Sequence, residues 1–469
     1  MSPAVAYKSP ASRPSPAALR ALRKRFKGSV IEPAGAGWDA ATQAFNLTVL
    51  QEPALVALPA DQQDVATIVD FARAHGMQAA AQRTGHNAEP LGDIQDVILV
   101  KTNALDSVEI DAERRIARVG SGVKWGRVVP RASELGLAAL HGSTPDVSVT
   151  GYSLGGGVGW YARKLGLSAN SVTAIELVTG DGRLRRVDHD NDPDLFWALR
   201  GGGGNFGIVT AVEFRLYPVP DIYAGVLFFP WERSSEVLHA WLEWTSTVPD
   251  EVTSVGRILQ FPPIDEVPEP LRGGKFAVVE AVYMGDEATG SDILRPLREL
   301  GPAMDTFAMV PPVGLAELHM DPPDPVPYIG EGMMLGALDA QAVDRFVAAA
   351  GPDSGSALVS VEIRHVGGAL SRPQPHRGAL ATFDASFLTF GVGMVLDEQM
   401  HRANREQLEV LAEALAPYDT GRQYLNFTER PTDPARFYAP YAYRRLRAVK
   451  AQVDPDNLFR ANHPIPVGS

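Results

Sequence analysis

The sequence predicts an α+β protein of two domains, and three observations lead to this prediction. Its 469 residues are more than one ordinary hydrophobic core accommodates. Short apolar runs alternate with helical patterns between residues 53 and 217, and the connections are rich in glycine. The composition then changes at residues 217–220, beyond which strand-like runs and proline-rich loops follow. We therefore expect one domain over residues 1–218 and another that begins at residue 219.

The first domain is predicted to contain several short strands and an amphipathic helix. A strand ends at residues 56–59, after which Asp61 can cap a helix whose apolar residues recur at helical spacing until Gly76. The further strands are expected at residues 97–100, 116–119, 172–178 and 208–216. These elements indicate an α+β or α/β domain, preceded by a flexible start and a short basic helix.

The second domain is predicted to combine helices with strands. An amphipathic helix is expected at residues 236–244, and the alternating run at residues 358–365 suits a strand. A long helix with one apolar side is expected over residues 397–415. A final helix should run from about residue 434 to residue 453, because the residue before Pro455 disfavours helical geometry.

Charge and cysteine content exclude several classes of function. The formal net charge is −13, and an acidic surface repels phosphate backbones, so we expect no nucleic-acid partner. The chain contains no cysteine, which excludes disulfides, thiolate catalysis and zinc sites that rely on sulfur. We expect no metal. No segment is typical of a secretory signal or a membrane span, which predicts a soluble, cytoplasmic protein without a membrane partner.

Two glycine-rich runs, residues 142–159 and 201–207, are candidate ligand-binding loops. Backbone amides in such loops approach a phosphate closely because no side chain intervenes. One run alone is more often a tight turn, but two runs in one domain favour a large phosphate-bearing ligand. Neither run is a Walker loop or the glycine fingerprint of a doubly wound domain, so a dinucleotide would be held by a different fold.

The segment Arg83–Asn87 is a third candidate. An arginine beside a glycine can pair with a pyrophosphate while the backbone closes around it. His86 follows directly in this segment. Taken alone, a histidine after a turn is more often a hydrogen-bonded structural residue than a functional one.

Four segments resemble, in the same order, those of the p-cresol methylhydroxylase (PCMH) and vanillyl-alcohol oxidase superfamily. They are residues 83–87, 140–160, 194–210 and 453–459. The last resembles the terminal element of the berberine-bridge-enzyme branch, and the whole pattern is most similar to bacterial oxidases of the 6-hydroxy-D-nicotine oxidase type. The resemblance implies a PCMH-type FAD-binding domain and a substrate domain over residues 219–420, built on an antiparallel sheet with helices. It also implies a C-terminal segment, residues 421–469, that returns to the FAD domain.

The resemblance further implies that FAD is bound covalently through His86. Many relatives link the flavin a second time through a cysteine, whose position matches Thr144 here. Because the chain has no cysteine, a single histidyl linkage is expected. The residues implied to surround FAD are Arg83, Thr84, Gly85, His86 and Asn87 at the pyrophosphate, Gly142, Ser143, Thr144 and Val147 at the isoalloxazine edge, Gly151, Gly155, Gly156, Gly157 and Gly159 along the diphosphate and ribityl chain, Ile208 and Val209 at the adenine, and Asn426 near the pyrimidine ring.

The candidate catalytic residues are Glu362, Arg364 and Tyr424. Hydride removal from a C–H bond requires that a neighbouring O–H or N–H lose its proton. Glu362 and Arg364 alternate on one face of the predicted strand, and the resemblance implies that this face lies against the flavin. A glutamate beside an arginine is, however, often a surface ion pair. Tyr424 is the third candidate, because residues 424–427 resemble the family's tyrosine-x-asparagine strand.

The implied function is that of an FAD-dependent oxidase. It would take a hydride from an alcohol or amine carbon of a small organic substrate and reduce dioxygen to hydrogen peroxide. A dehydrogenase or an oxidative cyclase is the alternative, whereas a flavin-binding protein without catalysis would not need a covalent link. Val147 matches the position of the branch's oxygen gate, and valine leaves room for dioxygen. We expect a monomer or a homodimer.

Overall fold

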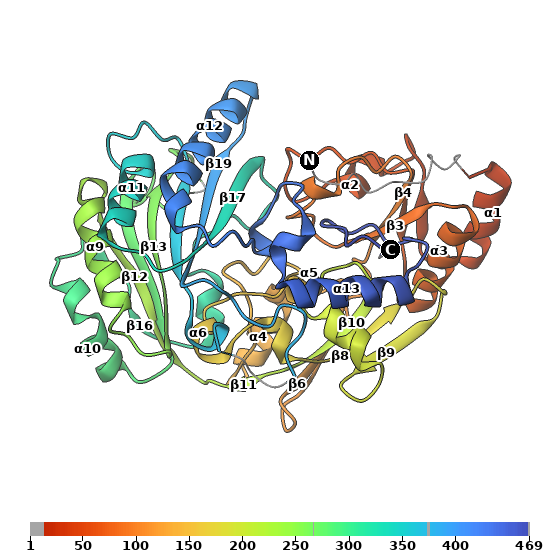
Figure 1. The fold of residues 1–469 in the computed structure, drawn as a ribbon, viewed down its shortest axis with the longest axis horizontal. Coiled ribbons are helices and arrows are strands. Elements are labelled where there is room, and N and C mark those ends of the chain that lie inside the picture. Colours follow the sequence, from red (N-terminus) through yellow and green to blue (C-terminus); the bar gives the residue numbers. More distant parts are fainter. Residues whose placement is uncertain (1–13, 266, 373–375, 468–469) are drawn as a thin grey trace.

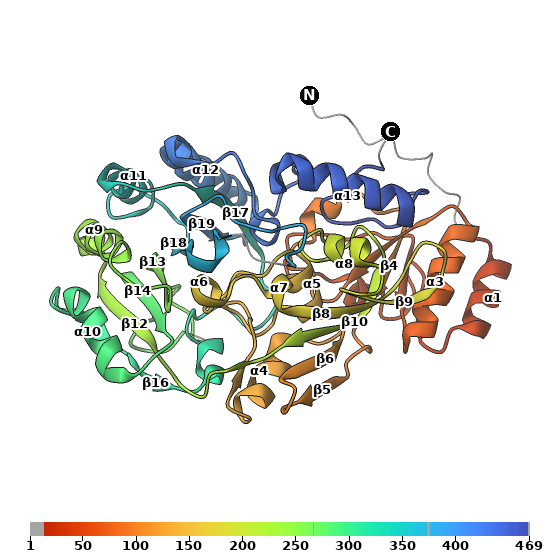
Figure 2. The ribbon, with the colours of Figure 1, turned by 60° about the horizontal axis from the view of Figure 1, so that its bottom comes forward.

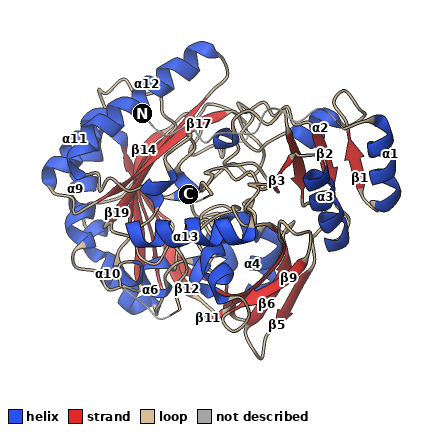
Figure 3. Cartoon of the chain, turned by 45° about the vertical axis from the view of Figure 1, so that its right-hand side comes forward, coloured by secondary structure: helices blue, strands red, loops and turns tan. Residues whose placement is uncertain are grey.

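The structure, a computed structural model, describes residues 14–265, 267–372 and 376–467. The predicted flexible start, residues 1–13, lies outside this part of the chain. Two smaller sheets from the N-terminal half lie beside one large sheet from the C-terminal half (Figure 1). Loops fill the region between the large sheet and the smaller ones (Figure 3). The α+β class is confirmed.

The first small sheet is mixed, with the order β1-β2-β4-β3, and β2, β4 and β3 are parallel. Its strands are β1 (Ser29–Ile31), β2 (Leu55–Leu58), β3 (Gln78–Gln82) and β4 (Val97–Lys101), accompanied by α1 (Pro16–Arg25), α2 (Trp38–Thr42) and α3 (Gln62–Ala74). Asp61 caps α3 by accepting hydrogen bonds from the backbone N–H groups of Gln63 and Asp64, as the sequence predicts.

The second small sheet is antiparallel, with the order β5-β6-β10-β8-β9. Its strands are β5 (Val108–Asp111), β6 (Ile116–Gly120), β8 (Val172–Val178), β9 (Leu184–Asp188) and β10 (Ile208–Arg215). The short elements around it are α4 (Trp125–Ser133), α5 (Val149–Leu154), α6 (Ala162–Leu165), α7 (Ser168–Ser171), α8 (Pro193–Leu199) and the pair β7 (Leu137–Ala138) and β11 (Tyr217–Pro218). The strands predicted in the first domain are confirmed, with ends shifted by no more than one residue.

The large sheet is antiparallel, with the order β15-β12-β14-β13-β18-β19-β17 and β16 paired to β12. Its strands are β12 (Ile222–Pro230), β13 (Val252–Gln260), β14 (Lys275–Tyr283), β15 (Met304–Asp305), β16 (Ala308–Val310), β17 (Tyr328–Leu335), β18 (Ser360–His365) and β19 (Phe387–Met394). Four helices cover one face, namely α9 (Ser234–Thr245), α10 (Glu287–Arg298), α11 (Ala340–Ala350) and α12 (Glu398–Leu415) (Figures 1 and 2). The opposite face lies toward the N-terminal half, because Val255 and Val282 pack with Leu140 and Trp160.

The chain returns to the N-terminal half after α12. Helix α13 (Pro440–Val453) packs on α8 (Figure 2). Phe459 then pairs in parallel with Ala79 at the edge of β3. The ammonium group of Lys450 is fully buried and forms an ion pair of 2.5 Å with Asp454, which fixes the end of α13. No helix in the described ranges is both long and apolar enough to cross a membrane.

Two predicted elements need correction. The final helix begins at Pro440 rather than near residue 434, because Pro434–Phe437 form a separate 3-10 turn and Ala439, before Pro440, is extended with ψ of 146°. Residues 424–427 do not form a strand, since Leu425–Phe427 form a 3-10 turn. There the Tyr424 carbonyl accepts a hydrogen bond from the N–H of Phe427 three residues on, rather than from a neighbouring strand.

Candidate active site

His86 lies in a tight loop directly after β3. Gly85 adopts φ of 84°, and a Cβ at this position would lie 2.9 Å from Ala44 Cα, so a larger residue does not fit. The Thr84 hydroxyl oxygen lies 2.9 Å from His86 Nδ1. His86 Nε2 is buried and has no hydrogen-bond partner among the described residues. A buried polar atom without a partner is costly, so this nitrogen is a candidate for contact with a group that the protein itself does not supply.

Two aromatic side chains hold the His86 segment in place. The Phe45 ring stacks on the imidazole with 3.8 Å between the centroids. Tyr328, the first residue of β17, donates a hydrogen bond of 3.1 Å to the His86 carbonyl. Burial lowers the pKa of His86 to about 3, and the charge of Lys124 adds to this effect. The imidazole is therefore neutral, and its orientation is restrained by these contacts.

The other polar residues of this loop are bound by distant parts of the chain. Arg83 Nε donates a hydrogen bond of 2.5 Å to the Gly122 carbonyl. The Asn87 side-chain amide donates to the Leu425 carbonyl at 3.1 Å, and the Asn462 amide donates to the Asn87 carbonyl. The C-terminal segment therefore helps to fix the position of the histidine.

The second predicted loop, residues 142–159, is closely packed around its glycines. A Cβ on Gly155 would lie 1.8 Å from Asn426 Oδ1, and a Cβ on Gly159 would lie 1.8 Å from the His141 carbonyl oxygen. Any side chain at these two positions would displace the neighbouring segment. The remaining predicted glycines of this loop are Gly142, Gly156 and Gly157, which are buried, and Gly151, which is exposed on α5.

Tyr424 and Asn426 support this loop from the C-terminal segment. The Tyr424 hydroxyl oxygen accepts hydrogen bonds from the backbone N–H groups of Gly157 at 3.1 Å and Val158 at 2.9 Å. The Asn426 amide donates to the same hydroxyl oxygen and to the Tyr152 carbonyl, both at 3.0 Å. The structure thus brings these two predicted residues together with the glycine loop.

Glu362 and Arg364 lie on the face of the large sheet that the helices leave uncovered. Val361, between Glu362 and Ser360 on β18, belongs to the helix-covered core, so the alternate residues point toward the N-terminal half. The register places Glu362 opposite Arg257 of β13. The side chains of Glu362 and Arg364 are both nearly fully buried, so these two residues do not form an exposed surface ion pair.

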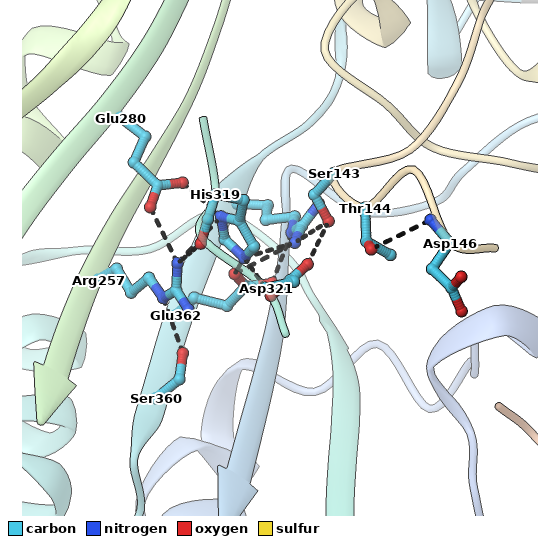
Figure 4. Close-up of polar contacts among 10 residues, drawn as sticks. Ser143, Thr144, Asp146, Arg257, Glu280, His319, Asp321, Ser360 and Glu362 are labelled. Carbon is cyan, nitrogen blue, oxygen red and sulfur yellow. Dashed lines mark hydrogen bonds and ion pairs between the residues drawn. The ribbon is translucent and has the colours of Figure 1, made fainter. Parts of the chain in front are cut away.

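A buried network of charges joins these residues (Figure 4). Arg364 Nε lies 2.5 Å from Glu362 Oε1. His319, from the loop before β17, lies between two carboxylates. Its Nδ1 is 2.5 Å from Glu280 Oε2, and its Nε2 is 2.9 Å from Glu362 Oε2. Arg257 Nη1 lies 3.0 Å from Glu280 Oε1 and donates to the His319 carbonyl at 2.7 Å.

The charges of the network determine its protonation states. Burial alone would raise the pKa of Glu362, but the charges of Arg364 and His319 outweigh burial and hold it below its ordinary value. The pKa of Glu280 is lowered in the same way, with burial outweighed by His319 and Arg257. Burial and Arg257 oppose the charge on His319, but the surrounding carboxylates outweigh them and raise its pKa. Glu362 is therefore a weakly basic carboxylate next to an imidazole whose pKa is raised.

Ser143 connects the second loop to this network (Figure 4). Its hydroxyl donates to Asp321 Oδ2 at 3.2 Å and accepts from Arg364 Nη2 at 3.4 Å. Asp321 Oδ1 lies 4.0 Å from His319 Nε2. The next residue, Thr144, is half-buried and accepts a hydrogen bond from the Asp146 backbone N–H at 3.5 Å. Loop and sheet therefore meet at a cluster of charges.

Ile208 and Val209 lie apart from this cluster. They begin β10, opposite Val178 and Leu177 of β8, and both side chains are nearly fully buried. Ile208 packs into the apolar core around α3. Their predicted contact with a nucleotide would therefore have to use backbone atoms.

Six residues that contact the His86 segment or belong to the charged network were missed by the sequence analysis, namely Phe45, Arg257, Glu280, His319, Asp321 and Tyr328. A signal existed for Glu280, because a lone acid within the apolar run at residues 276–283 requires a partner when that strand is buried. The proline-rich loop that carries His319 and Asp321 shows no periodicity from which their positions could be inferred.

Comparison with known proteins identifies the family. Residues 53–188 match the FAD binding domain family, and residues 423–466 match the family described as berberine and berberine like. The chain is 30% identical over 463 residues to (R)-6-hydroxynicotine oxidase of Paenarthrobacter nicotinovorans, with 95% of this chain and 98% of the relative covered. The chain belongs to the berberine-bridge-enzyme-like family of FAD-linked oxidoreductases. The predicted family resemblance is confirmed.

Solved structures of this family share the whole fold. The crystal structure of 6-hydroxy-D-nicotine oxidase from Arthrobacter nicotinovorans has a TM-score of 0.79 and 27% identity, with 94% of this chain and 98% of that chain covered. Glucooligosaccharide oxidase from Acremonium strictum, described with a 6-S-cysteinyl, 8α-N1-histidyl FAD, has a TM-score of 0.82 and 21% identity, with 96% and 99% covered. The PCMH-type FAD-binding fold and the enzyme class of a berberine-bridge-like oxidoreductase are thereby confirmed.

Proposed function

We propose that this protein is an FAD-dependent oxidase that takes a hydride from an alcohol or amine carbon of a small organic molecule. The two electrons would pass to dioxygen, giving hydrogen peroxide. The observation that supports this most strongly is the imidazole of His86, which is half-buried and held neutral by its lowered pKa, and whose buried Nε2 has no hydrogen-bond partner in the described part of the chain. The names of its relatives include a hydroxynicotine oxidase, whose substrate is an amine, and a glucooligosaccharide oxidase, whose substrate is a sugar.

FAD fits the residues that surround His86. The loop Arg83–Asn87 would enclose the pyrophosphate, and the glycines of residues 142–159 would let the backbone follow the diphosphate and ribityl chain. Asn426 would lie near the pyrimidine ring, and the backbone of Ile208 and Val209 near the adenine. When bound, FAD supplies a hydride acceptor at the ring nitrogen N5.

We propose that His86 makes a single covalent link to the flavin. Glucooligosaccharide oxidase is described with a second link through a cysteine at ring position 6. The resemblance assigns that cysteine position to Thr144, and the chain contains no cysteine. Thr144 would therefore lie beside flavin C6, which is the ring carbon on the N5 side of the flavin.

The face of the large sheet that carries Glu362 and Arg364 is proposed to border the substrate. Both carboxylate oxygens of Glu362 are engaged by Arg364 and His319. Glu362 would thus act on the substrate through its charge and position, and Arg364 would orient the Glu362 carboxylate. Tyr424 is proposed to act from the other side, where its hydroxyl shapes the glycine loop around the flavin.

Dioxygen is the proposed electron acceptor. Val147 is half-buried, and its carbonyl accepts a hydrogen bond of 3.0 Å from the Trp125 N–H, which fixes the backbone of the loop here. A valine at this position would leave the flavin open to dioxygen, whereas a longer side chain would close the approach.

A substrate screen tests the proposal. Purified protein should be yellow and should be bleached under nitrogen by alcohols or amines that are substrates. Admission of air should restore the colour with release of one hydrogen peroxide per flavin. A protein that bleaches but reoxidises no faster than free reduced flavin would be a dehydrogenase, and a colourless protein would overturn the cofactor assignment.

A further inference from the structure

We infer that Asp321, in the loop between β16 and β17, is the catalytic base that accepts the substrate's O–H or N–H proton. This inference rests on the proposed function and deepens it. As the hydride leaves the substrate carbon for the flavin, the proton on the neighbouring oxygen or nitrogen passes to an Asp321 carboxylate oxygen. A C=O or C=N bond forms, and the electron pair of the C–H bond reduces the flavin.

The contacts of the carboxylate oxygens with cationic side chains favour Asp321 over Glu280 and Glu362 as the base. Glu362 has Oε1 engaged by Arg364 at 2.5 Å and Oε2 engaged by His319 at 2.9 Å. Glu280 has Oε1 engaged by Arg257 at 3.0 Å and Oε2 by His319 at 2.5 Å. Cationic partners at these distances stabilise the charged form of both glutamates and make them weak bases.

Asp321 differs from both glutamates in its contacts and exposure. Its Oδ2 accepts one hydrogen bond, from the neutral hydroxyl of Ser143 at 3.2 Å. Its Oδ1 lies 4.0 Å from His319 Nε2, which is beyond hydrogen-bond distance. The side chain is 27% exposed, compared with 0% for Glu280 and 3% for Glu362. Asp321 therefore presents an oxygen to the space beside the network.

The contact with Ser143 places this carboxylate close to the reacting atoms. Ser143 directly precedes Thr144, which the proposed function puts beside flavin C6. Since C6 is on the N5 side of the ring, Asp321 would border the position from which a substrate carbon delivers its hydride. A base in this location would reach the hydroxyl or amine next to that carbon.

The surrounding charges suit proton uptake at Asp321. Two arginines, Arg257 and Arg364, and the imidazole of His319 face the carboxylates of Glu280, Asp321 and Glu362. A proton received by Asp321 would make the net charge of the cluster one unit more positive. This charge would arise next to the electron pair that moves to the flavin, and would stabilise it.

Sulfite tests the location of Asp321 without knowledge of the substrate. This anion adds to flavin N5 and bleaches the colour, so a nearby carboxylate weakens its binding. We expect Asp321→Asn to lower the Kd for sulfite at least about tenfold, because one negative charge beside N5 is removed. Asp321→Glu, which keeps the charge, should resemble the wild type. Asp324→Asn, at an exposed position of the same loop, is the matched control and should leave the Kd within about twofold.

Flavin reduction then tests the role. With a substrate that bleaches the wild type under nitrogen, Asp321→Asn should slow reduction at least about a hundredfold, while Asp324→Asn should not. An unchanged sulfite Kd, or unchanged reduction, in an Asp321→Asn protein with normal flavin content overturns the inference. A wild-type protein that holds no flavin overturns the proposed function instead, so the two failures are distinguishable.

Discussion

The ring of Phe45 lies nearly parallel to the imidazole of His86, with the planes inclined by 14°. The Phe45 backbone is itself fixed, because its N–H donates to the Thr84 carbonyl at 2.8 Å and its carbonyl accepts from the Val326 N–H at 3.1 Å. The stacked ring therefore limits rotation of the imidazole. Formation of the proposed flavin bond should depend on both residues.

His86→Ala should abolish covalent attachment. The imidazole is the proposed nucleophile, so FAD would remain with the variant only until the protein is denatured. Acid precipitation of wild type and variant, followed by flavin fluorescence of pellet and supernatant, measures this. His189→Ala, at an exposed histidine, is the control and should keep its flavin. Peptide mapping that places the flavin on a residue other than His86 would contradict the assignment.

Phe45→Leu should slow attachment without preventing FAD binding. Leucine keeps an apolar side chain against the imidazole but removes the parallel ring, so the nucleophile spends less time in the reactive orientation. The time course of covalent flavin formation after FAD is added to apoprotein should be at least about fivefold slower, a modest loss for a positioning residue. Equal rates in wild type and variant would show that Thr84 alone orients His86.

Thr144→Cys should introduce a second flavin linkage. Thr144 is half-buried, the resemblance assigns the cysteine position to it, and its side chain is close in size to cysteine. Denatured variant protein should therefore yield a flavin peptide that joins two chain segments by mass spectrometry. If His86 remains the single attachment point, the loop lies farther from ring position 6 than proposed.

Val147→Leu should slow reoxidation by air while leaving anaerobic flavin reduction nearly unchanged. The extra methylene would occupy the proposed approach of dioxygen, and the substrate side would not be touched. Stopped-flow measurement of the two half-reactions separates these effects. Val147→Ala is the opposing variant and should reoxidise at least as fast as wild type.

Glu429→Gln should stabilise the protein at pH 8 but not at pH 5. Burial raises the pKa of Glu429 to about 8, and the charges of Glu89 and Glu331 add to this effect. The unfolded chain releases this proton near the ordinary carboxyl pKa, so stability is lost as the pH rises from about 4.5 to about 8. Glutamine has no proton to lose. Thermal unfolding should show a gain of at least about 1 kcal/mol at pH 8, where one pKa unit corresponds to about 1.4 kcal/mol. An equal effect at both pH values would contradict the assigned protonation.

Local patterns in the sequence are sufficient for some features and insufficient for others. The cap at Asp61, the strand at 172–178 and the loop around His86 follow from residues that are neighbours in the chain. The contact of His319 with Glu280 and Glu362 depends on the order of β14, β13 and β18 in the sheet and on an irregular loop. Strand order and loop path are tertiary properties that periodicity does not encode.

The failed prediction at residues 424–427 has the same origin. The tyrosine-x-asparagine motif is recognisable from neighbouring residues, but its backbone forms a turn in which the Tyr424 carbonyl is bonded within the segment. The side chains reach Gly157 and Tyr152, more than 250 residues earlier in the chain. The side-chain contacts of a motif can thus depend on distant partners that its local sequence pattern does not reveal.

The pairing of Ala79 with the C-terminal segment has a consequence for biosynthesis. Ala79 donates its N–H to the Leu458 carbonyl at 2.9 Å, and its own carbonyl accepts from the Arg460 N–H at 3.0 Å. The strand that leads into the His86 loop thus lacks its edge partner until the ribosome has made residue 460. We therefore expect the proposed flavin attachment to follow translation of this segment.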